Sequence, residues 1–229
     1  GNDKQRGNPA WNQLQTTFLD DMDKAGYDLD AIDNVLCTHL HIDHVGWNTM
    51  LVGGIWVPTF PNARYLIGQN EFTYWQATTD SEQASVMSDS VLPVFDAGLV
   101  DLVETDHKIS DEISLMPTVG HTPGHVSVMI KSKNETALIT GDFIHHPCQF
   151  AHPEWTAAPD SDPVQAVQTR REIFAKFADT PTLIIGTHFA TPTAGYLRRD
   201  GDVYSEAARP CICPLGCEEN TTTSAMGEG

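Results

Sequence analysis

The chain has 229 residues and a formal net charge of −18 at pH 7. An acidic surface repels phosphate backbones, so nucleic acid is not expected as a partner. No run approaches the roughly 20 consecutive apolar residues that cross a bilayer, which argues against a membrane partner. With 40% hydrophobic and 19% charged residues, the composition is that of a globular domain with a substantial core.

Residues 11–26 predict the first helix. Trp11, Leu14, Phe18 and Met22 recur every three or four positions, and Gly26 can end the helix. Further helix is expected over residues 71–76 and 80–96. Short apolar or β-branched runs predict strands over residues 33–39, 64–67, 99–103, 113–117, 126–130, 137–140 and 182–186.

The last predicted helix lies within residues 160–179. Asp162 can cap it, and Pro163 suits the first helical position. The residues expected on its buried side are Val164, Val167, Phe174 and Phe177. The mixture of strands and helices predicts a layered α/β domain over residues 1–204, followed by an irregular tail over residues 205–229.

Five cysteines do not form a spaced disulfide framework. Three of them, Cys211, Cys213 and Cys217, lie in the tail sequence CICPLGC. They could bind a soft metal, although such thiols in a low-complexity tail are more often incidental.

The strongest sign of a functional site is the sequence THLHIDHVG, residues 38–46. His39 and His41 lie two apart, so they point the same way from an extended backbone. Asp43 and His44 follow where the chain can turn towards a helix. Imidazole nitrogens and carboxylate oxygens are suitable zinc ligands, and burying such a cluster without a metal would be costly.

Three later segments place one further candidate ligand each at the end of a predicted strand. In GHTPGHVSV the candidate is His125, while His121 could instead orient the loop. In TGDFIHH it is Asp142, whose two carboxylate oxygens can bridge two cations. In IIGTHFA it is His188.

Five imidazoles and two carboxylates exceed the needs of one tetrahedral zinc and suit two metal ions. One ion would take His39, His41 and His125. The other would take Asp43, His44 and His188, with Asp142 between the two. Zinc is the default for these ligands, with iron, manganese and cobalt as alternatives.

The H-x-H-x-D-H run followed by distant His, Asp and His resembles the metallo-β-lactamase superfamily over most of residues 30–200. The resemblance implies an αββα sandwich with the metals at one edge between its two sheets. HIDHVGWN, GHTPGH and the stretch from Gln149 through DSDP to Arg171 are similar to N-acyl homoserine lactonases and methyl parathion hydrolase-like enzymes.

Two departures from that family pattern affect what is expected. The family begins with a β-rich segment, whereas this chain starts almost directly at the first helix, so the first strands are expected to be absent from the sandwich. Lactonases of the family carry a tyrosine three residues after the bridging aspartate, where this chain has His145. An imidazole can still donate a hydrogen bond to a substrate oxygen.

These features predict a binuclear hydrolase in which a hydroxide bridging two divalent ions attacks a lactone or carboxylic ester. Asp43 would also pass a proton to the leaving group, and His145 would orient the substrate. One alternative is an organophosphate triester hydrolase with the same metals. Another is an inactive metal-binding fragment or interaction domain. The expected partner is a small ester or lactone, and an exposed sheet edge could favour a homodimer.

Aromatic residues near the metal loops could line the substrate pocket, with simple core packing as the alternative, and these are Trp47, Trp56, Phe60, Phe143 and Phe150. The default location is cytoplasmic, with the alternative that a secretion signal preceded the first residue.

Overall fold

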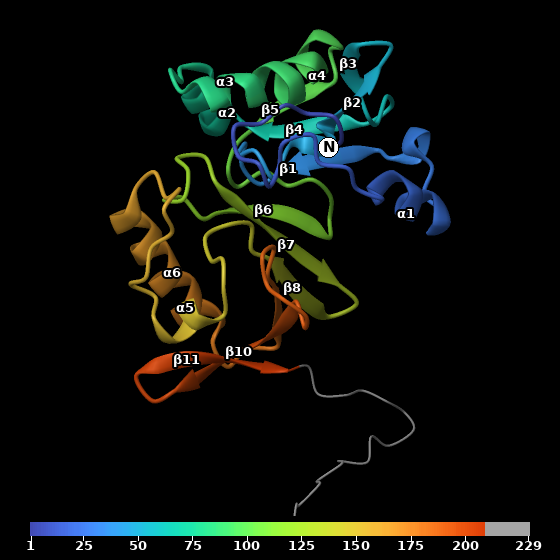
Figure 1. Cartoon of the computed structure of the whole chain (residues 1–229). Coiled ribbons are helices and arrows are strands. Elements are labelled where there is room, and N and C mark those ends of the chain that lie inside the picture. The colour runs from blue at the N-terminus through green and yellow to red at the C-terminus, as the bar shows by residue number, and fades with distance from the viewer. Residues whose placement is uncertain (209–229) are drawn as a thin grey trace, which may run out of the picture.

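The computed structural model describes residues 1–208, so the three tail cysteines lie outside the described residues. Two β-sheets stack face to face, and helices cover the outer face of each (Figure 1). The predicted αββα sandwich is therefore confirmed. Among residues 1–208, no helix combines the length and the apolar character needed to cross a bilayer.

The first sheet contains three parallel strands in the order β1-β4-β5. Their bounds are β1 (Asn34–Cys37), β4 (Arg64–Gly68) and β5 (Val100–Val103). On β4, Leu66 packs into a cluster between the sheets, whereas its neighbour Ile67 packs towards the helices. Because both faces are covered, these strands are nearly continuous apolar runs.

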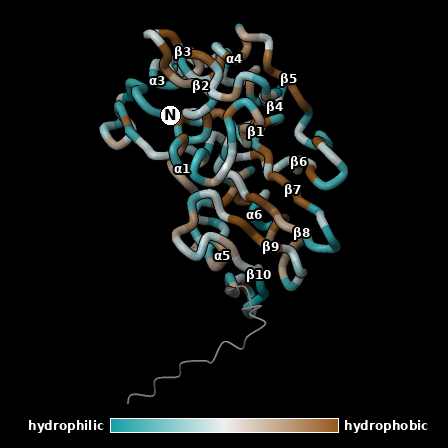
Figure 2. The backbone as a smooth tube through the Cα atoms, turned by 90° about the vertical axis from the view of Figure 1, so that its right-hand side faces the viewer, coloured by the Kyte–Doolittle hydropathy of each residue, from teal (hydrophilic) through white to brown (hydrophobic). Residues whose placement is uncertain are grey.

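The second sheet has six strands in the order β11-β10-β9-β8-β7-β6. Only β8 and β9 pair in parallel. Figure 2 shows hydrophobic stretches along β7 and β9. The bounds are β6 (Ile113–Pro117), β7 (Val126–Ser132), β8 (Glu135–Ile139), β9 (Thr182–Ile185), β10 (Ala194–Asp200) and β11 (Val203–Ala208).

Helices α2, α3 and α4 cover the first sheet, and α5 and α6 lie against the second (Figure 1). A π-helical turn over Met87–Val91 joins α3 to α4. The bounds are α1 (Phe18–Lys24), α2 (Gln69–Gln76), α3 (Ser81–Val86), α4 (Leu92–Asp96), α5 (Cys148–Ala151) and α6 (Pro163–Phe177).

Helix α6 starts as predicted, because the Asp162 side chain accepts a hydrogen bond from the backbone N–H of Gln165. The prediction that Val164 is buried is wrong, since it is 81% exposed in the first turn. Phe174 and Phe177 are buried as predicted, and Val167 is half-buried. The other buried residues of the helix are Ala166, Thr169, Arg170 and Ile173.

The first predicted helix is too long. Helix α1 begins only at Phe18, and Gln13 has a φ of +52°, which a continuous helix cannot contain. Hydrogen bonds hold the preceding segment to other parts of the chain; one runs from the Arg6 N–H to the Asn12 side chain. Trp11 and Leu14 are consequently 37% and 42% exposed instead of forming a buried helical face.

Two hairpins lie outside the elements predicted from sequence. Strands β2 (Thr49–Val52) and β3 (Ile55–Pro58) are joined by Gly53 and Gly54, both with positive φ. Strands β10 and β11 turn at Gly201, also with positive φ. Both turns carry glycine signals that sequence can reveal. Strand β11 runs to Ala208, four residues past the expected domain boundary at 204.

Candidate metal centre

Four connections meet at one edge of the sandwich. The loop after β1 carries His39, His41, Asp43 and His44. The other candidate ligands lie just before β7, just after β8 and just after β9. Each side chain is thus anchored by a buried strand while its functional atoms lie in a loop, the arrangement that holds a site rigidly and leaves it open to a substrate.

Asp142 lies at the middle of this cluster and is 3% exposed. One of its oxygens, Oδ2, is surrounded by the Nε2 atoms of five imidazoles. The distances are 3.1 Å to His188, 3.2 Å to His44, 3.4 Å to His145, 3.6 Å to His121 and 3.8 Å to His39. Nitrogen atoms are therefore directed at one point, although they come from distant parts of the sequence.

Candidate ligand atoms fall into three compact groups, each with all atoms within 4.8 Å of one another. These are His39, His41 and His121; Asp43, His44, Asp142 and His188; and His121, Asp142 and His145. The second group is the set of ligands expected for one ion. His121 and His145 extend the cluster beyond the seven residues predicted as ligands.

His125 lies outside those three groups, so its assignment as a ligand stays a prediction. Its ring is fully buried, and its Nδ1 lies 2.8 Å from the Thr118 hydroxyl. Its Nε2 accepts a hydrogen bond from the Asp142 N–H at 2.8 Å. Gly141, with a φ of +57°, is required here because a Cβ would lie 2.6 Å from that Nε2.

His121 is oriented by a buried acid that the sequence did not single out. Its Nδ1 lies 2.8 Å from Oδ1 of Asp160, and its Nε2 lies 2.9 Å from Nδ1 of His41. Oδ2 of Asp160 lies 3.9 Å from the buried guanidinium of Arg170. Asp160 is 39 residues from His121, and no local pattern links the two residues.

The imidazoles fall into two groups that differ in the direction of their pKa shift. Burial lowers the pKa of His39 well below its usual value and that of His41 to about 4, so these rings are neutral at pH 7. Burial also opposes the charged form of His44, but hydrogen bonds to neighbouring carboxylates outweigh it and raise its pKa to about 9. A hydrogen bond to Asp142 raises the pKa of His188.

The donor set fits divalent metal ions. Nε2 of His39 and Oδ1 of Asp142 are buried and have no hydrogen-bond partner among residues 1–208. Such atoms are expensive to bury unless a further group satisfies them. Neutral imidazoles can coordinate a cation directly, whereas His44 must first lose its proton, so metal binding at this cluster would release protons.

The family model described as metallo-beta-lactamase superfamily matches residues 5–188. The chain belongs to the metallo-β-lactamase superfamily. The match covers all seven residues predicted as metal ligands, from His39 to His188.

Curated relatives within this superfamily include an N-acyl homoserine lactonase from Bacillus sp., which is 25% identical over 165 residues. That alignment covers 71% of this chain and 58% of the relative. A second N-acyl homoserine lactonase, from Bacillus cereus, is 27% identical over 120 residues. That alignment covers 52% of this chain and 41% of the relative. The chain therefore spans about two-fifths to three-fifths of these relatives.

Solved superfamily structures share the same fold. Hydrolase AbOPH superposes with a TM-score of 0.71 at 29% identity, covering 85% of this chain and 70% of that one. The dizinc quorum-quenching lactonase AidC, in complex with a product, also superposes with a TM-score of 0.71. Its identity is 21%, with 88% of this chain and 72% of AidC covered, so that likeness concerns the fold.

Two adjoining hollows open onto the candidate metal site of this chain. One, of about 300 Å³, contains Asp142, His145 and His188, and the other, of about 390 Å³, contains Leu14, Phe18 and Trp47. Both share Trp11, Ile42 and Asp43. The segment misassigned to the first helix thus supplies an apolar wall beside the cluster.

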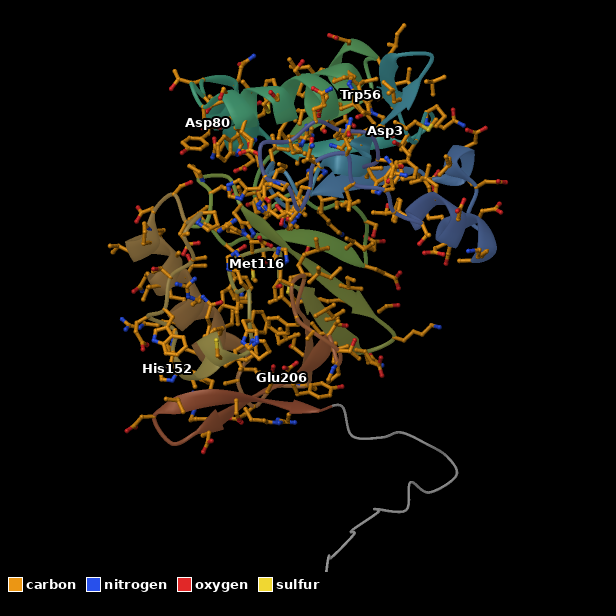
Figure 3. The ribbon with its side chains drawn as sticks, in the orientation of Figure 1. Asp3, Trp56, Asp80, Met116, His152 and Glu206 are labelled. Atoms are coloured by element: carbon orange, nitrogen blue, oxygen red, sulfur yellow. The ribbon has the colours of Figure 1, made fainter. Side chains whose placement is uncertain are left out.

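Of the aromatic residues considered as pocket walls, only Trp47 lines either hollow at the cluster. Phe60, Phe143 and Phe150 are buried in the core. Trp56 lies beside Asp3 and under the Lys4 ammonium, as the labels in Figure 3 help to locate. The core interpretation therefore holds for the three phenylalanines.

Proposed function

We propose that this protein is a binuclear metal-dependent hydrolase that opens a lactone or cleaves a carboxylic ester. The observation that carries the proposal is the convergence of five imidazole Nε2 atoms on Oδ2 of Asp142. A structural metal site needs only four ligands and is closed. Here the ligand set is larger and an open cleft adjoins it.

In this proposal Asp43, His44 and His188 would hold one ion, and Asp142 would be shared between both. His39 and His41 would hold the second ion together with His125, the third ligand predicted from sequence. His121 is the alternative third ligand, because it lies in one compact group with His39 and His41. When bound, two such ions supply a water with a pKa near 7 and polarise the oxygen under attack.

Asp43 and His145 contribute proton handling and orientation in this scheme. Oδ2 of Asp43 lies 3.5 Å from Nε2 of both His44 and His188, and its side chain is 26% exposed in the cleft. Asp43 can thus carry a proton to a leaving oxygen. The backbone N–H of His145 donates to Gln149 Oε1 at 2.7 Å, which fixes the position from which its ring reaches a substrate oxygen.

Replacing His145 separates orientation from metal binding. In His145→Phe we expect kcat to fall roughly 100-fold, because one hydrogen-bond donor to the substrate oxygen is lost. His145→Tyr should retain most activity, since a phenol also donates. Metal content should match the wild type in both. The exposed neighbour provides the control His146→Phe, and a phenylalanine variant with wild-type kcat would remove His145 from the mechanism.

The apolar side chains beside the cluster, including Trp11, Phe18 and Trp47, are expected to select substrates by the length of their acyl group. Trp11 is shared by both hollows, and Phe18 stacks on Trp47 with ring centroids 5.3 Å apart. In Trp11→Ala we expect kcat/KM for long-chain acyl substrates to fall roughly tenfold, with little change for short ones, because apolar contact is lost. Tyr27→Ala is the control. Equal losses for all chain lengths would place the acyl chain elsewhere.

A phosphotriesterase activity at the same site is the second candidate. It is favoured by the indole and phenyl rings beside the cluster, which suit an aryl leaving group. Both candidates use the same metals and the same cleft, so they differ only in the electrophile that is attacked.

The deciding experiment combines metal analysis with a substrate panel. Purified protein would be assayed for metal content and for hydrolysis of an N-acyl homoserine lactone, an aryl carboxylic ester and an aryl phosphotriester. About two metals per chain with turnover of the lactone or the ester supports the first proposal. Turnover of the triester alone supports the second. Metal without turnover would support an inactive metal-binding domain, and the absence of metal would contradict both proposals.

A further inference from the structure

Two buried side chains from the helical layer form hydrogen bonds with the loop that carries His39 and His41. They are Glu71, on α2, and Gln83, on α3, which are 1% and 7% exposed. Neither belongs to a group of candidate metal ligands. Both reach the peptide groups of Leu40, the fully buried residue between His39 and His41.

The two contacts act on opposite sides of Leu40. Its backbone N–H donates to Glu71 Oε1 at 3.0 Å, and its carbonyl accepts a hydrogen bond from Gln83 Nε2 at 2.7 Å. Leu40 lies beyond the end of β1, so strand pairing does not satisfy its buried N–H and carbonyl groups. The side chains of Glu71 and Gln83 satisfy both groups. Because His39 and His41 flank Leu40, the orientation of the Leu40 backbone sets the directions of their imidazoles.

The second oxygen of Glu71 binds the other histidine loop. Its Oε2 accepts a hydrogen bond from the N–H of Gly124 at 3.0 Å. Gly124 lies between His121 and His125 in the sequence GHTPGH. A Cβ on Gly124 would lie 2.3 Å from the backbone nitrogen of Glu71, so this loop rests directly on the first turn of α2.

A single carboxylate therefore joins two loops that are far apart in sequence. Burial raises the pKa of Glu71, which shows that the environment penalises its charge. Three uncharged N–H groups donate hydrogen bonds to it, from Leu40, Gly124 and the Trp75 indole. A carboxylate is suited to this position because it accepts at both oxygens and donates at neither.

We propose that Glu71, with Gln83, is a positioning residue that sets the spacing between the two histidine loops and thereby the affinity of the site for metal. This inference rests on the proposed metal centre. Residues that orient metal ligands without touching the metal change metal affinity by about 10- to 100-fold when they are altered.

The test measures zinc affinity in variants by competition with a chelator. In Glu71→Gln one loop N–H must face the amide NH₂, so one of the two loops loses its acceptor. We expect the zinc dissociation constant to rise about 10- to 100-fold. Gln83→Leu, which keeps the carboxylate, should show a smaller rise of about fivefold. Glu104→Gln, at an exposed position, is the matched control and should leave the affinity unchanged.

Thermal unfolding of the metal-free variants distinguishes positioning from a merely structural role. Positioning predicts weaker zinc binding at temperatures where the variant is fully folded. The double variant should lose less affinity than the two single losses combined, because both side chains act through Leu40. Wild-type zinc affinity in folded Glu71→Gln and Gln83→Leu would overturn this inference alone. Absence of zinc binding by the wild type would overturn the proposed metal centre with it.

Discussion

Replacing Asp142 with asparagine is expected to abolish most activity while leaving the protein folded. The amide keeps the shape of the carboxylate but removes the negative charge that five imidazole Nε2 atoms face. It also removes the oxygen proposed to bridge the two ions. We expect kcat/KM to fall on the order of a thousandfold, which corresponds to about 4 kcal/mol of transition-state stabilisation.

Metal analysis and kinetics on the same preparation check this expectation. Zinc content should fall below two per chain, and added zinc should restore little activity. Asp96→Asn, at an exposed position at the end of α4, is the control and should behave like the wild type. A D142N variant with two zinc ions and wild-type turnover would show that this carboxylate is not the bridge.

The largest effect on stability is expected from Arg170→Met. The Arg170 side chain is fully buried, and its guanidinium donates to the carbonyls of Pro153 and Phe143 at 2.9 and 3.1 Å. It also lies 3.9 Å from the buried carboxylate of Asp160. Methionine fills a similar space but leaves two carbonyls without their donor and the Asp160 carboxylate without its buried cation. Removing one partner of a buried charge pair costs about 3 kcal/mol or more.

Urea denaturation of the metal-free protein measures this loss directly. The adjacent Arg171 is exposed on α6, so Arg171→Met is a matched control that should change the free energy of unfolding by less than about 0.5 kcal/mol. Because Asp160 contacts His121, the Arg170 variant is also expected to bind metal more weakly. Equal unfolding free energies for the two methionine variants would mean that solvent or another group replaces the Arg170 contacts.

The sequence by itself determined the fold class and the main residues of the candidate site. Buried parallel strands leave short apolar runs, and the ligand-bearing motifs follow or precede such runs directly. His39 and His41, two residues apart after β1, and Asp142, three residues after the end of β8, were found for that reason. Helix α6 was also recognisable, because the Asp162 cap is encoded within four residues.

Only the tertiary structure decided how those residues are supported and what surrounds them. The apolar spacing of residues 11–22 resembles a helix, yet Gln13 has a left-handed conformation, its N–H donates to the carbonyl of Lys4, and Trp11 lies beside the cluster. The Glu71 contacts to Leu40 and Gly124 span 31 and 53 residues. Periodicity reports only neighbours along the chain, so hydrogen bonds made across such separations leave no local pattern and appear only when the two sheets are packed.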